Sequence, residues 1–377
     1  MQNHIDLELL NEVRDVKELL SNIHLNNEIM ITFNLKKYFP VRLGIVDVLL
    51  RRKIYVKAVD GISFRVREGE VFCLVGESGC GKTTTGRTVI GLTLPTSGYV
   101  LYKPRREVAK ELIELGYDPI KGDYFLLNDL FKVRKANKLL RRELQIIFQD
   151  PYSALNPRHT VGYIVEEPLI IQGLKDREER RRIVYQVLRD VKLTPPEDFI
   201  NRRPHQLSGG QRQRVCIARA LILNPRFIVA DEPVSMLDVS IRAEILKLML
   251  ELREKRKLTY LFITHDLATA RLICNKIAVM YLGKIVEQGR VIDVLTNPQH
   301  PYTKALMLAI PEPVPERKYL RIKLPVKGEV PSAINIPHGC RFHPRCPHTM
   351  DLCKRKEPPL IKVGTERFVA CWLYAKR

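Results

Sequence analysis

The residues best suited to do chemistry in this chain lie in the stretch 76–83, which reads GESGCGKT. Its glycines let backbone N–H groups turn toward an anion, and the start of a following helix adds positive potential. The lysine can then reach the β- and γ-phosphates of a nucleotide, and the threonine hydroxyl can ligate Mg²⁺. An apolar run at 71–75 and a helical pattern at 84–92 supply the strand and helix that a phosphate-binding loop requires. The expected contacts to the nucleotide are Gly76, Glu77, Ser78, Gly79, Cys80, Gly81, Lys82, Thr83 and Thr84.

A second apolar run, residues 227–230, ends in two adjacent carboxylates, Asp231 and Glu232. At the tip of a buried strand, Asp231 can hold the Mg²⁺ shell. Glu232 can polarise the water that attacks the γ-phosphate, because in-line phosphoryl transfer needs a base. The sequence therefore predicts a site for nucleotide hydrolysis, with Lys82 and Glu232 in catalytic roles.

A third motif, residues 207–211, reads LSGGQ. Serine is a natural N-cap, and adjacent glycines allow a close backbone approach to an anion. In this order and spacing the three motifs resemble the nucleotide-binding domain of an ABC-type ATPase. The resemblance implies that this helix start points at the γ-phosphate of ATP bound by a second subunit, so that neither subunit has a complete site alone. The residues concerned are Ser208, Gly209, Gly210 and Gln211.

The same resemblance assigns roles to further residues. Gln149 stands where the family has its metal- and water-sensing glutamine, and His265 where it has the histidine that contacts the γ-phosphate. Asp238 lies in a stretch, SMLD, that resembles the loop crossing to the opposite subunit. Gln149 and His265 thereby join the expected catalytic residues. The expected Mg²⁺ ligands are Thr83, Gln149 and Asp231.

The adenine ring needs an aromatic side chain on which to stack, and two tyrosines compete for this role. Tyr38 follows the strand predicted at 29–35, in what we expect to be a loop, and is the first candidate. Tyr55 is the alternative, because stacking on a base tolerates many surrounding sequences and so does not distinguish the two tyrosines.

Three stretches resemble the ATPases of oligopeptide/dipeptide importers: residues 148–158, 280–287 and 300–303. The resemblance covers about residues 30–374 and implies that the chain energises solute uptake from the cytoplasmic face of the cell membrane. The implied partners are two membrane-spanning permease subunits, a second ATPase subunit (a paralogue or the same chain) and, indirectly, an extracytoplasmic solute-binding protein. Peptides are the first expectation for the solute, with oligosaccharides or nickel as alternatives.

Four of the eight cysteines lie close together near the C-terminus, at Cys340, Cys346, Cys353 and Cys371. In a reducing compartment such a group suggests a metal site rather than disulfides. Thiolates select zinc or iron–sulfur clusters, and spacing does not separate the two. The peptide-importer ATPases carry a similar set, which implies a [4Fe–4S] cluster, with zinc or no metal as the alternatives. The other four cysteines lie in core or motif positions and are expected to be small buried residues.

The length of 377 residues suits one large α/β domain with a smaller addition. We expect a P-loop NTPase (RecA-like) core with an antiparallel β-subdomain, an α-helical subdomain at about 143–225 and a small, separate cysteine-rich C-terminal appendage. The expected divisions are an N-terminal helix in 1–28, the nucleotide-binding domain at 29–297, and a proline-rich extended linker with the appendage at 298–377. The charged stretch 101–142 is interpreted as an insertion or an elaborated surface region.

The net charge of +21 raises the question of nucleic-acid binding. The bases are scattered in short clusters, mostly with acids nearby, which is typical of solvated helix faces, so no nucleic-acid partner is expected. A soluble ABC ATPase acting on ribosomes or nucleic acid remains the alternative function. A redox or iron sensor that uses the cysteines is a third possibility. No apolar stretch is long enough to span a bilayer.

Overall fold

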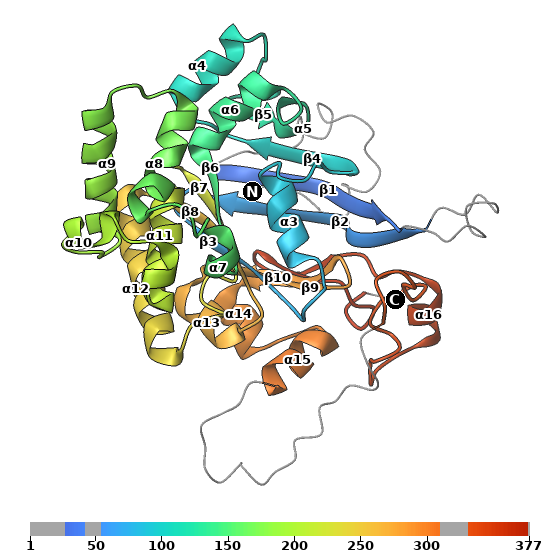
Figure 1. The fold of residues 1–377 in the computed structure, drawn as a ribbon. Coiled ribbons are helices and arrows are strands. Elements are labelled where there is room, and N and C mark those ends of the chain that lie inside the picture. Colours follow the sequence, from blue (N-terminus) through green and yellow to red (C-terminus); the bar gives the residue numbers. More distant parts are fainter. Residues whose placement is uncertain (1–26, 42–53, 310–330, 376–377) are drawn as a thin grey trace, which may run out of the picture.

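The computed structural model describes residues 27–41, 54–309 and 331–375 (Figure 1). Residues 1–26, which make up most of the region 1–28 where we expected an N-terminal helix, lie outside the described residues, as does the proline-rich stretch 310–330. The described residues contain no helix with the length and apolar character to cross a membrane.

The larger sheet has a parallel centre and an antiparallel edge. In spatial order its strands are β11 (Ile361–Gly364), β12 (Arg367–Val369), β10 (Lys284–Arg290), β9 (Lys276–Tyr281), β3 (Val71–Val75), β8 (Thr259–Thr264), β7 (Phe227–Asp231) and β6 (Leu144–Ile147). The five strands from β9 to β6 are parallel, and the other three run antiparallel to their neighbours. Successive residues of β3 alternate between two hydrophobic cores, with Cys73 in one and Leu74 in the other. Burial on both faces explains its continuous apolar sequence.

The smaller sheet is antiparallel and lies beside the larger one (Figure 1). Its strands in order are β2 (Tyr55–Arg67), β1 (Glu28–Pro40), β4 (Ser97–Tyr102) and β5 (Phe125–Leu126). The loop expected from Tyr38 onward is wrong, because β1 continues through Pro40. Pairing of Tyr38 with Lys57 and of Pro40 with Tyr55 satisfies this backbone, although the side chains are too exposed to show an apolar pattern.

The charged stretch 101–142 is folded and belongs to this part of the molecule. It contains the end of β4 and all of β5, together with α4 (Arg106–Glu114), α5 (Leu127–Leu130) and α6 (Arg134–Glu143). Each helix turns an apolar side into a core shared with the sheets, as the buried Leu112, Leu127 and Leu140 show. The charged residues lie on the outer sides, which is why the composition alone resembles an unpacked surface.

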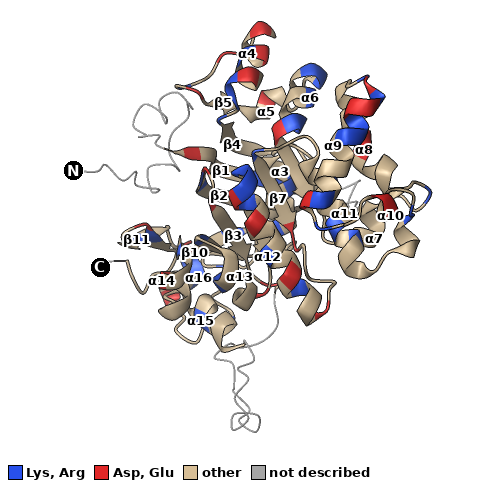
Figure 2. Cartoon of the chain, turned by 90° about the vertical axis from the view of Figure 1, so that its left-hand side faces the viewer, with Lys and Arg blue, Asp and Glu red and all other residues tan. Residues whose placement is uncertain are grey.

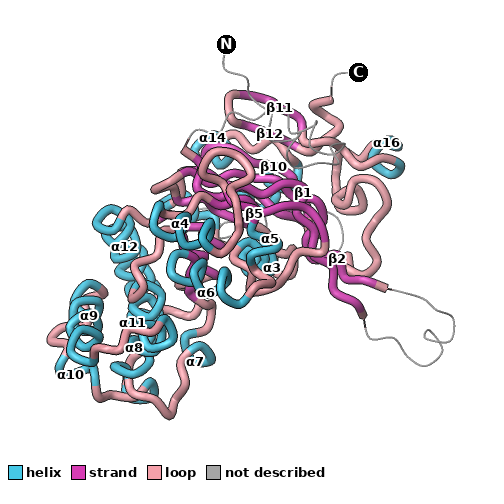
Figure 3. Tube along the Cα trace, turned by 90° about the horizontal axis from the view of Figure 1, so that it is seen from above, coloured by secondary structure: helices cyan, strands magenta, loops and turns pink. Residues whose placement is uncertain are grey.

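A group of helices extends away from the strands (Figure 3). Its members are α7 (Pro151–Ala154), α8 (Val161–Gln172), α9 (Arg177–Asp190), α10 (Glu197–Ile200) and α11 (Gly209–Leu221). All five lie within the stretch of about 143–225 where we expected an α-helical subdomain. Val184, Val187 and Leu188 are buried on one side of α9, as their spacing predicts.

Further helices belong neither to this group nor to the stretch 101–142 (Figure 1). They are α3 (Lys82–Val89), α12 (Val239–Arg256), α13 (Leu267–Ile273), α14 (Val291–Thr296), α15 (Pro301–Leu308) and α16 (Asp351–Arg355). The extended crossing expected from residue 298 is wrong for its first part, since α15 begins at Pro301. Pro301 sits at the first helical position, where its missing N–H costs nothing, and the His300 ring caps the helix at Tyr302 N.

The C-terminal cysteine-rich segment is not the separate appendage that we expected. Its strand β12 pairs with β10 and extends the larger sheet. Phe342 is 1% exposed and lies in the hydrophobic core beside Tyr281 and Tyr302. A small segment with little core of its own gains stability by completing that of its neighbour.

Basic and acidic residues are interleaved on the outer helices rather than gathered by sign (Figure 2). Ion pairs such as Arg142–Glu111 and Lys192–Glu251 illustrate the mixing.

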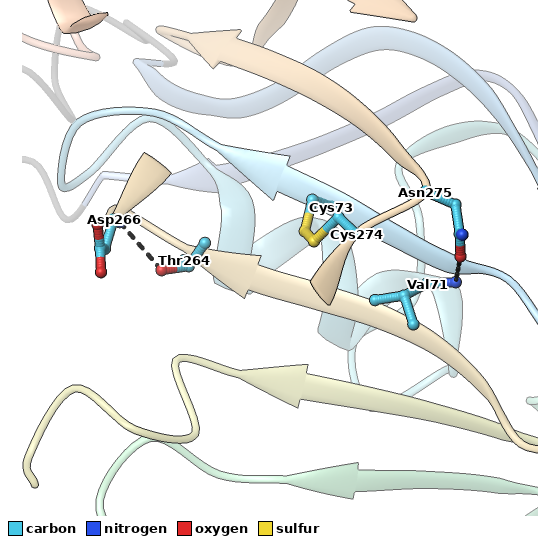
Figure 4. The surroundings of a disulfide bond; sticks show 6 residues. All are labelled: Val71, Cys73, Thr264, Asp266, Cys274 and Asn275. Carbon is cyan, nitrogen blue, oxygen red and sulfur yellow. Dashed lines mark hydrogen bonds between the residues drawn. A yellow bond between two sulfur atoms is a disulfide. The ribbon is translucent and has the colours of Figure 1, made fainter. Parts of the chain in front are cut away.

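A disulfide joins Cys73 in β3 to Cys274 just before β9 (Figure 4). Beside it, Asn275 Oδ1 accepts a hydrogen bond from Val71 N, and Val71 O accepts one from Asn275 N. Both of these cysteines are buried, as are Cys80 and Cys216, which are free, so the expectation of small buried residues is confirmed for all four.

Candidate nucleotide site

The phosphate loop joins β3 to α3 and is held in a form that only glycine permits. Gly81 has φ 106°, and a Cβ there would lie 2.0 Å from the carbonyl oxygen of Ala58. Ser78 and Gly79 form the exposed part of the turn, and Thr84 lies in the first turn of α3. The buried Lys82 Nζ donates to the carbonyls of Gly76 and Glu77, at 2.8 and 3.0 Å. The ammonium thus already lies within the loop, where a phosphate would compete with two neutral carbonyls for it.

The hydroxyl and carboxylate expected to hold Mg²⁺ are brought together. Thr83 Oγ1 donates to Asp231 Oδ1 at 2.8 Å, so the start of α3 meets the end of β7. Burial raises the pKa of Asp231, and the hydrogen bond from Thr83 partly offsets this effect. A hard cation at this point would find two oxygen ligands and would favour the ionised carboxylate.

Glu232 lies at the centre of a second cluster. Its carboxylate Oε2 accepts a hydrogen bond from Gln149 Nε2 at 3.3 Å and lies 2.9 Å from His265 Nδ1. The turn that carries it is unusual for a non-glycine residue, with φ 44°, and is tied to β8 by a hydrogen bond from Glu232 N to Ile263 O. The side chain of Glu232 is 13% exposed, whereas that of His265 is 58% exposed. Gln149 and His265, which are far apart in the sequence, therefore converge on the Glu232 carboxylate.

The signature motif LSGGQ forms the N-terminus of α11 through a capping box. Ser208 Oγ accepts from Gln211 N at 3.3 Å, and Gln211 Oε1 accepts from Ser208 N at 3.0 Å. Gly210 is needed because a Cβ would lie 2.7 Å from Ile241. Ser208 is exposed, so this helix start is open to an approaching molecule.

Asp238 is the N-cap of α12. Its carboxylate accepts hydrogen bonds from Ile241 N at 3.0 Å and Ser240 Oγ at 2.8 Å, and the backbone bond lowers its pKa. The side chain is exposed. The loop it occupies is therefore ordered locally while presenting an anion to the surroundings.

The two candidate tyrosines differ in their surroundings. The Tyr38 hydroxyl donates to Asp60 Oδ1, and burial beside that carboxylate raises its pKa. Tyr38 pairs with Lys57, the neighbour of the Ala58 whose carbonyl lies against Gly81. Tyr55 pairs with Pro40 at the end of the hairpin and is 41% exposed. Of the two, Tyr38 is closer to the phosphate loop along the strands.

The four C-terminal cysteines line one cavity together with His300, His343 and His348. Burial, with the neighbouring thiols adding to it, raises the pKa of Cys340 to about 12 and that of Cys371 to about 11. No group of three or more His, Cys, Asp or Glu residues within the described ranges is arranged to hold a metal ion. The thiols are therefore gathered at one place, but their sulfur atoms are not in a coordinating arrangement.

Sequence reasoning missed two arginines between these cysteines. Arg345 pairs with Glu77 of the phosphate loop, and Arg341 pairs with Asp60, the partner of Tyr38. In the sequence, these arginines are marked only by their position between two cysteines, and that position does not indicate a contact with the nucleotide site.

Comparison with known proteins agrees with this geometry. Residues 59–235 match the ABC transporter family, and the chain is 30% identical to a bacterial ABC transporter cassette solved as a dimer (TM-score 0.55, covering 70% of this chain and 99% of that one). The same cassette has been solved as a dimer bound to ADP and Pi, with the same similarity. The chain belongs to the ABC transporter family and has the P-loop NTPase fold of its ATP-binding cassettes.

A second match indicates the branch of the family to which the chain belongs. Residues 286–353 match the C-terminal region of oligopeptide/dipeptide transporters. The oligopeptide transport ATP-binding protein AppF of Bacillus subtilis is 44% identical over 91% of this chain and 96% of its own length. The dipeptide transport ATP-binding protein DppF of Haemophilus influenzae is 42% identical over 97% and 99%. The chain is thus a member of the oligopeptide/dipeptide branch of the family.

Proposed function

We propose that this chain is the ATP-hydrolysing subunit that energises a peptide importer. The observation that carries the proposal is the convergence of Gln149 and His265 on Glu232, beside the hydrogen-bonded pair of Thr83 and Asp231. Relatives covering nearly the whole chain are named for oligopeptide and dipeptide transport, which favours peptides over oligosaccharides or nickel. The same relatives argue against the alternative function, an ABC ATPase that acts on ribosomes or nucleic acid.

In this proposal the chain's residues divide the work of hydrolysis. Lys82 binds the β- and γ-phosphates, and Thr83, Gln149 and Asp231 would hold Mg²⁺, which neutralises developing phosphate charge when bound. Glu232 accepts the proton of the attacking water, His265 contacts the γ-phosphate and orients that carboxylate, and Gln149 orients the water.

The exposed helix start at Ser208 completes the site of a second subunit. The backbone N–H groups of Gly209 and Gly210, together with Gln211, would face the γ-phosphate across the dimer, and Asp238 would cross the same interface. ATP contacted from both sides favours the closed dimer, and hydrolysis removes that preference. The second subunit is a paralogue or another copy of this chain.

The partners follow from the same assignment. Two permease subunits would receive the ATPase dimer at the cytoplasmic face of the membrane, and a solute-binding protein would deliver the solute on the other side.

Extraction from native membranes in mild detergent, followed by identification of the co-purified proteins, tests the proposed partners directly. Recovery of two multi-span proteins and a solute-binding protein supports the importer, whereas ribosomal or DNA-bound partners would overturn it.

For the domain organisation, we propose an N-terminal helix in 1–28, a nucleotide-binding domain at 29–297 with a helical subdomain at about 143–225, and a linker with a C-terminal domain at 298–377. Of that last part, Tyr302 and Phe342 pack in the core of the nucleotide-binding domain.

The adenine contact gives a selective prediction. Tyr38→Ala is expected to raise the KM for ATP about tenfold with little change in kcat, because base stacking contributes about 1–3 kcal/mol. Tyr38→Phe, which keeps the ring, should retain most of the affinity, and Tyr55→Ala serves as the matched control. ATP titration of the hydrolysis rate measures all three. The reverse pattern, with Tyr55→Ala impaired, would transfer the role to Tyr55.

For the four cysteines we propose a [4Fe–4S] cluster, with zinc as the alternative. All four thiols line one cavity, and four thiolates are the ligand set of such a cluster. Bringing the sulfur atoms into coordination requires loss of their protons, which metal binding itself drives. The cluster's contribution would be structural, tying three parts of the C-terminal segment together.

Metal analysis of anaerobically purified protein tests the assignment. Cys353→Ser is expected to lose most bound iron and acid-labile sulfide, because three thiolates hold a cluster poorly. Cys216→Ser is the matched control, since Cys216 is also buried and free but lies outside the cavity. Stoichiometric zinc without iron in the unmodified protein would identify the alternative. Equal metal content in both variants would contradict a site at these cysteines.

A further inference from the structure

The phosphate loop is held by a residue from the far end of the chain. Arg345 Nη1 donates to both carboxylate oxygens of Glu77, at 3.3 and 3.0 Å, across 268 positions of sequence. The side chain of Arg345 is 10% exposed and that of Glu77 is 29% exposed. Because Arg345 is largely buried and Glu77 is partly buried, this ion pair is screened less than the exposed pairs of the outer helices.

The surroundings of Arg345 fix its position. Its guanidinium lies 5.9 Å from the ring centres of both Tyr281 and Phe342. The hydroxyl of Tyr302, in the same aromatic cluster, accepts a hydrogen bond from Glu77 N at 2.9 Å. Glu77 is therefore held by the C-terminal part of the chain through its backbone and its side chain at once.

Charge gives this contact a consequence for nucleotide binding. Glu77 is the only acidic residue in the stretch 76–84, and it lies in a loop that must accept a polyanion. An unpaired carboxylate there would repel the phosphates and would compete for Lys82, whose ammonium already bonds to the Glu77 carbonyl. We propose that Arg345 is a positioning residue of the ATP site, which neutralises Glu77 and holds the phosphate loop in its binding form. The proposal rests on the nucleotide-binding role of that loop given above.

The other arginine of the same loop supports this view. Arg341 bonds to Leu282 O and to Asp60, which in turn accepts from the Tyr38 hydroxyl. Residues 340–346 therefore reach both the phosphate loop and the proposed adenine contact. Cys340 and Cys346 are the ends of this loop. The fold of the cysteine-rich segment therefore sets the positions of both arginines.

A double-mutant cycle tests the proposal. Arg345→Met keeps the apolar stem against the aromatic rings but removes the charge, and is expected to weaken MgATP binding about tenfold, which corresponds to about 1.4 kcal/mol. The mechanism predicts that Arg345→Met combined with Glu77→Gln recovers most of this loss, because no uncompensated carboxylate remains. Equilibrium binding of a fluorescent ATP analogue measures the affinities, and steady-state kinetics should show the change in KM rather than in kcat. Arg142→Met, at the distant pair with Glu111, is the matched control.

Additive losses in the double variant, or unchanged affinity in Arg345→Met, would overturn the proposal. If Arg345→Met does not fold, Arg345→Gln takes its place in the cycle, because it is also uncharged. The same tenfold loss of MgATP affinity and the same recovery with Glu77→Gln are expected, and unchanged affinity would contradict charge neutralisation. The unmodified chain is measured in the same assays. If that chain does not bind ATP, the nucleotide site itself is wrong; if it binds ATP and the Arg345 variants behave like it, only the positioning role of Arg345 is wrong.

Discussion

Glu232→Gln is expected to reduce the rate of ATP hydrolysis about 10³-fold while leaving ATP binding intact, because general-base catalysis contributes about 10²–10⁴-fold. The amide retains the shape of the side chain and can still contact Gln149 and His265, so the geometry of the cluster should persist. ATP would then remain bound at both interfaces, and the variant should accumulate as a closed dimer. Phosphate release measures the rate, and size-exclusion chromatography in MgATP measures the dimer.

The matched control for this substitution is Glu244→Gln. Glu244 lies on α12, is 61% exposed and pairs with Arg214, so the same chemical change there should leave hydrolysis unaltered. A monomeric Glu232→Gln variant that hydrolyses ATP at the normal rate would show that another group accepts the proton. A monomeric but inactive variant would retain Glu232 as the base and contradict ATP as the link between subunits.

Lys82→Met is expected to weaken ATP binding about 100-fold, since hydrogen bonds to charged groups contribute about 1.5–3 kcal/mol each. Methionine is similar in length and apolar, so the buried stem of the side chain is preserved while the ammonium is lost. Equilibrium binding of a fluorescent ATP analogue measures the effect. Because nucleotide drives dimer closure, this variant should also stay monomeric in MgATP at concentrations where Glu232→Gln dimerises.

Lys192→Met provides the control for Lys82→Met, because Lys192 is half exposed and pairs with Glu251 on the surface. Its ATP affinity and dimerisation should match those of the unmodified chain. Normal ATP affinity in Lys82→Met would mean that the loop binds phosphate through its backbone alone, and the role given to the ammonium would be wrong.

The local parts of the nucleotide site could be predicted from the sequence because each depends on a short stretch of chain. The glycines at 76, 79 and 81 precede a helix, the apolar run 227–230 ends in two acids, and Ser208 caps a helix that carries its own partner, Gln211. In each case the backbone conformation and the chemistry lie within a few residues of one another. Because β3 and β7 are buried on both faces, their sequences are continuous apolar runs, and both strands could be predicted from these runs.

Two local predictions failed because exposed or polar residues carry little pattern. Tyr38 to Pro40 continue a strand through pairing with β2, and α15 forms in a stretch whose prolines suggested an extended chain. Tertiary contacts decided the structure of both segments. They also stabilise the stretch 101–142, which folds on its apolar residues although its overall composition is highly charged.

The sequence by itself determined the chemistry of this protein: a nucleotide site, its candidate base and metal ligands, and the family to which they belong. Only the tertiary structure decided which distant groups meet, because such contacts depend on the packing of whole layers and not on local preference. Gln149 and Glu232 lie 83 positions apart and come together at the ends of neighbouring parallel strands. Arg345 reaches Glu77 because β12 and Phe342 dock the cysteine-rich segment on the sheet that carries the phosphate loop.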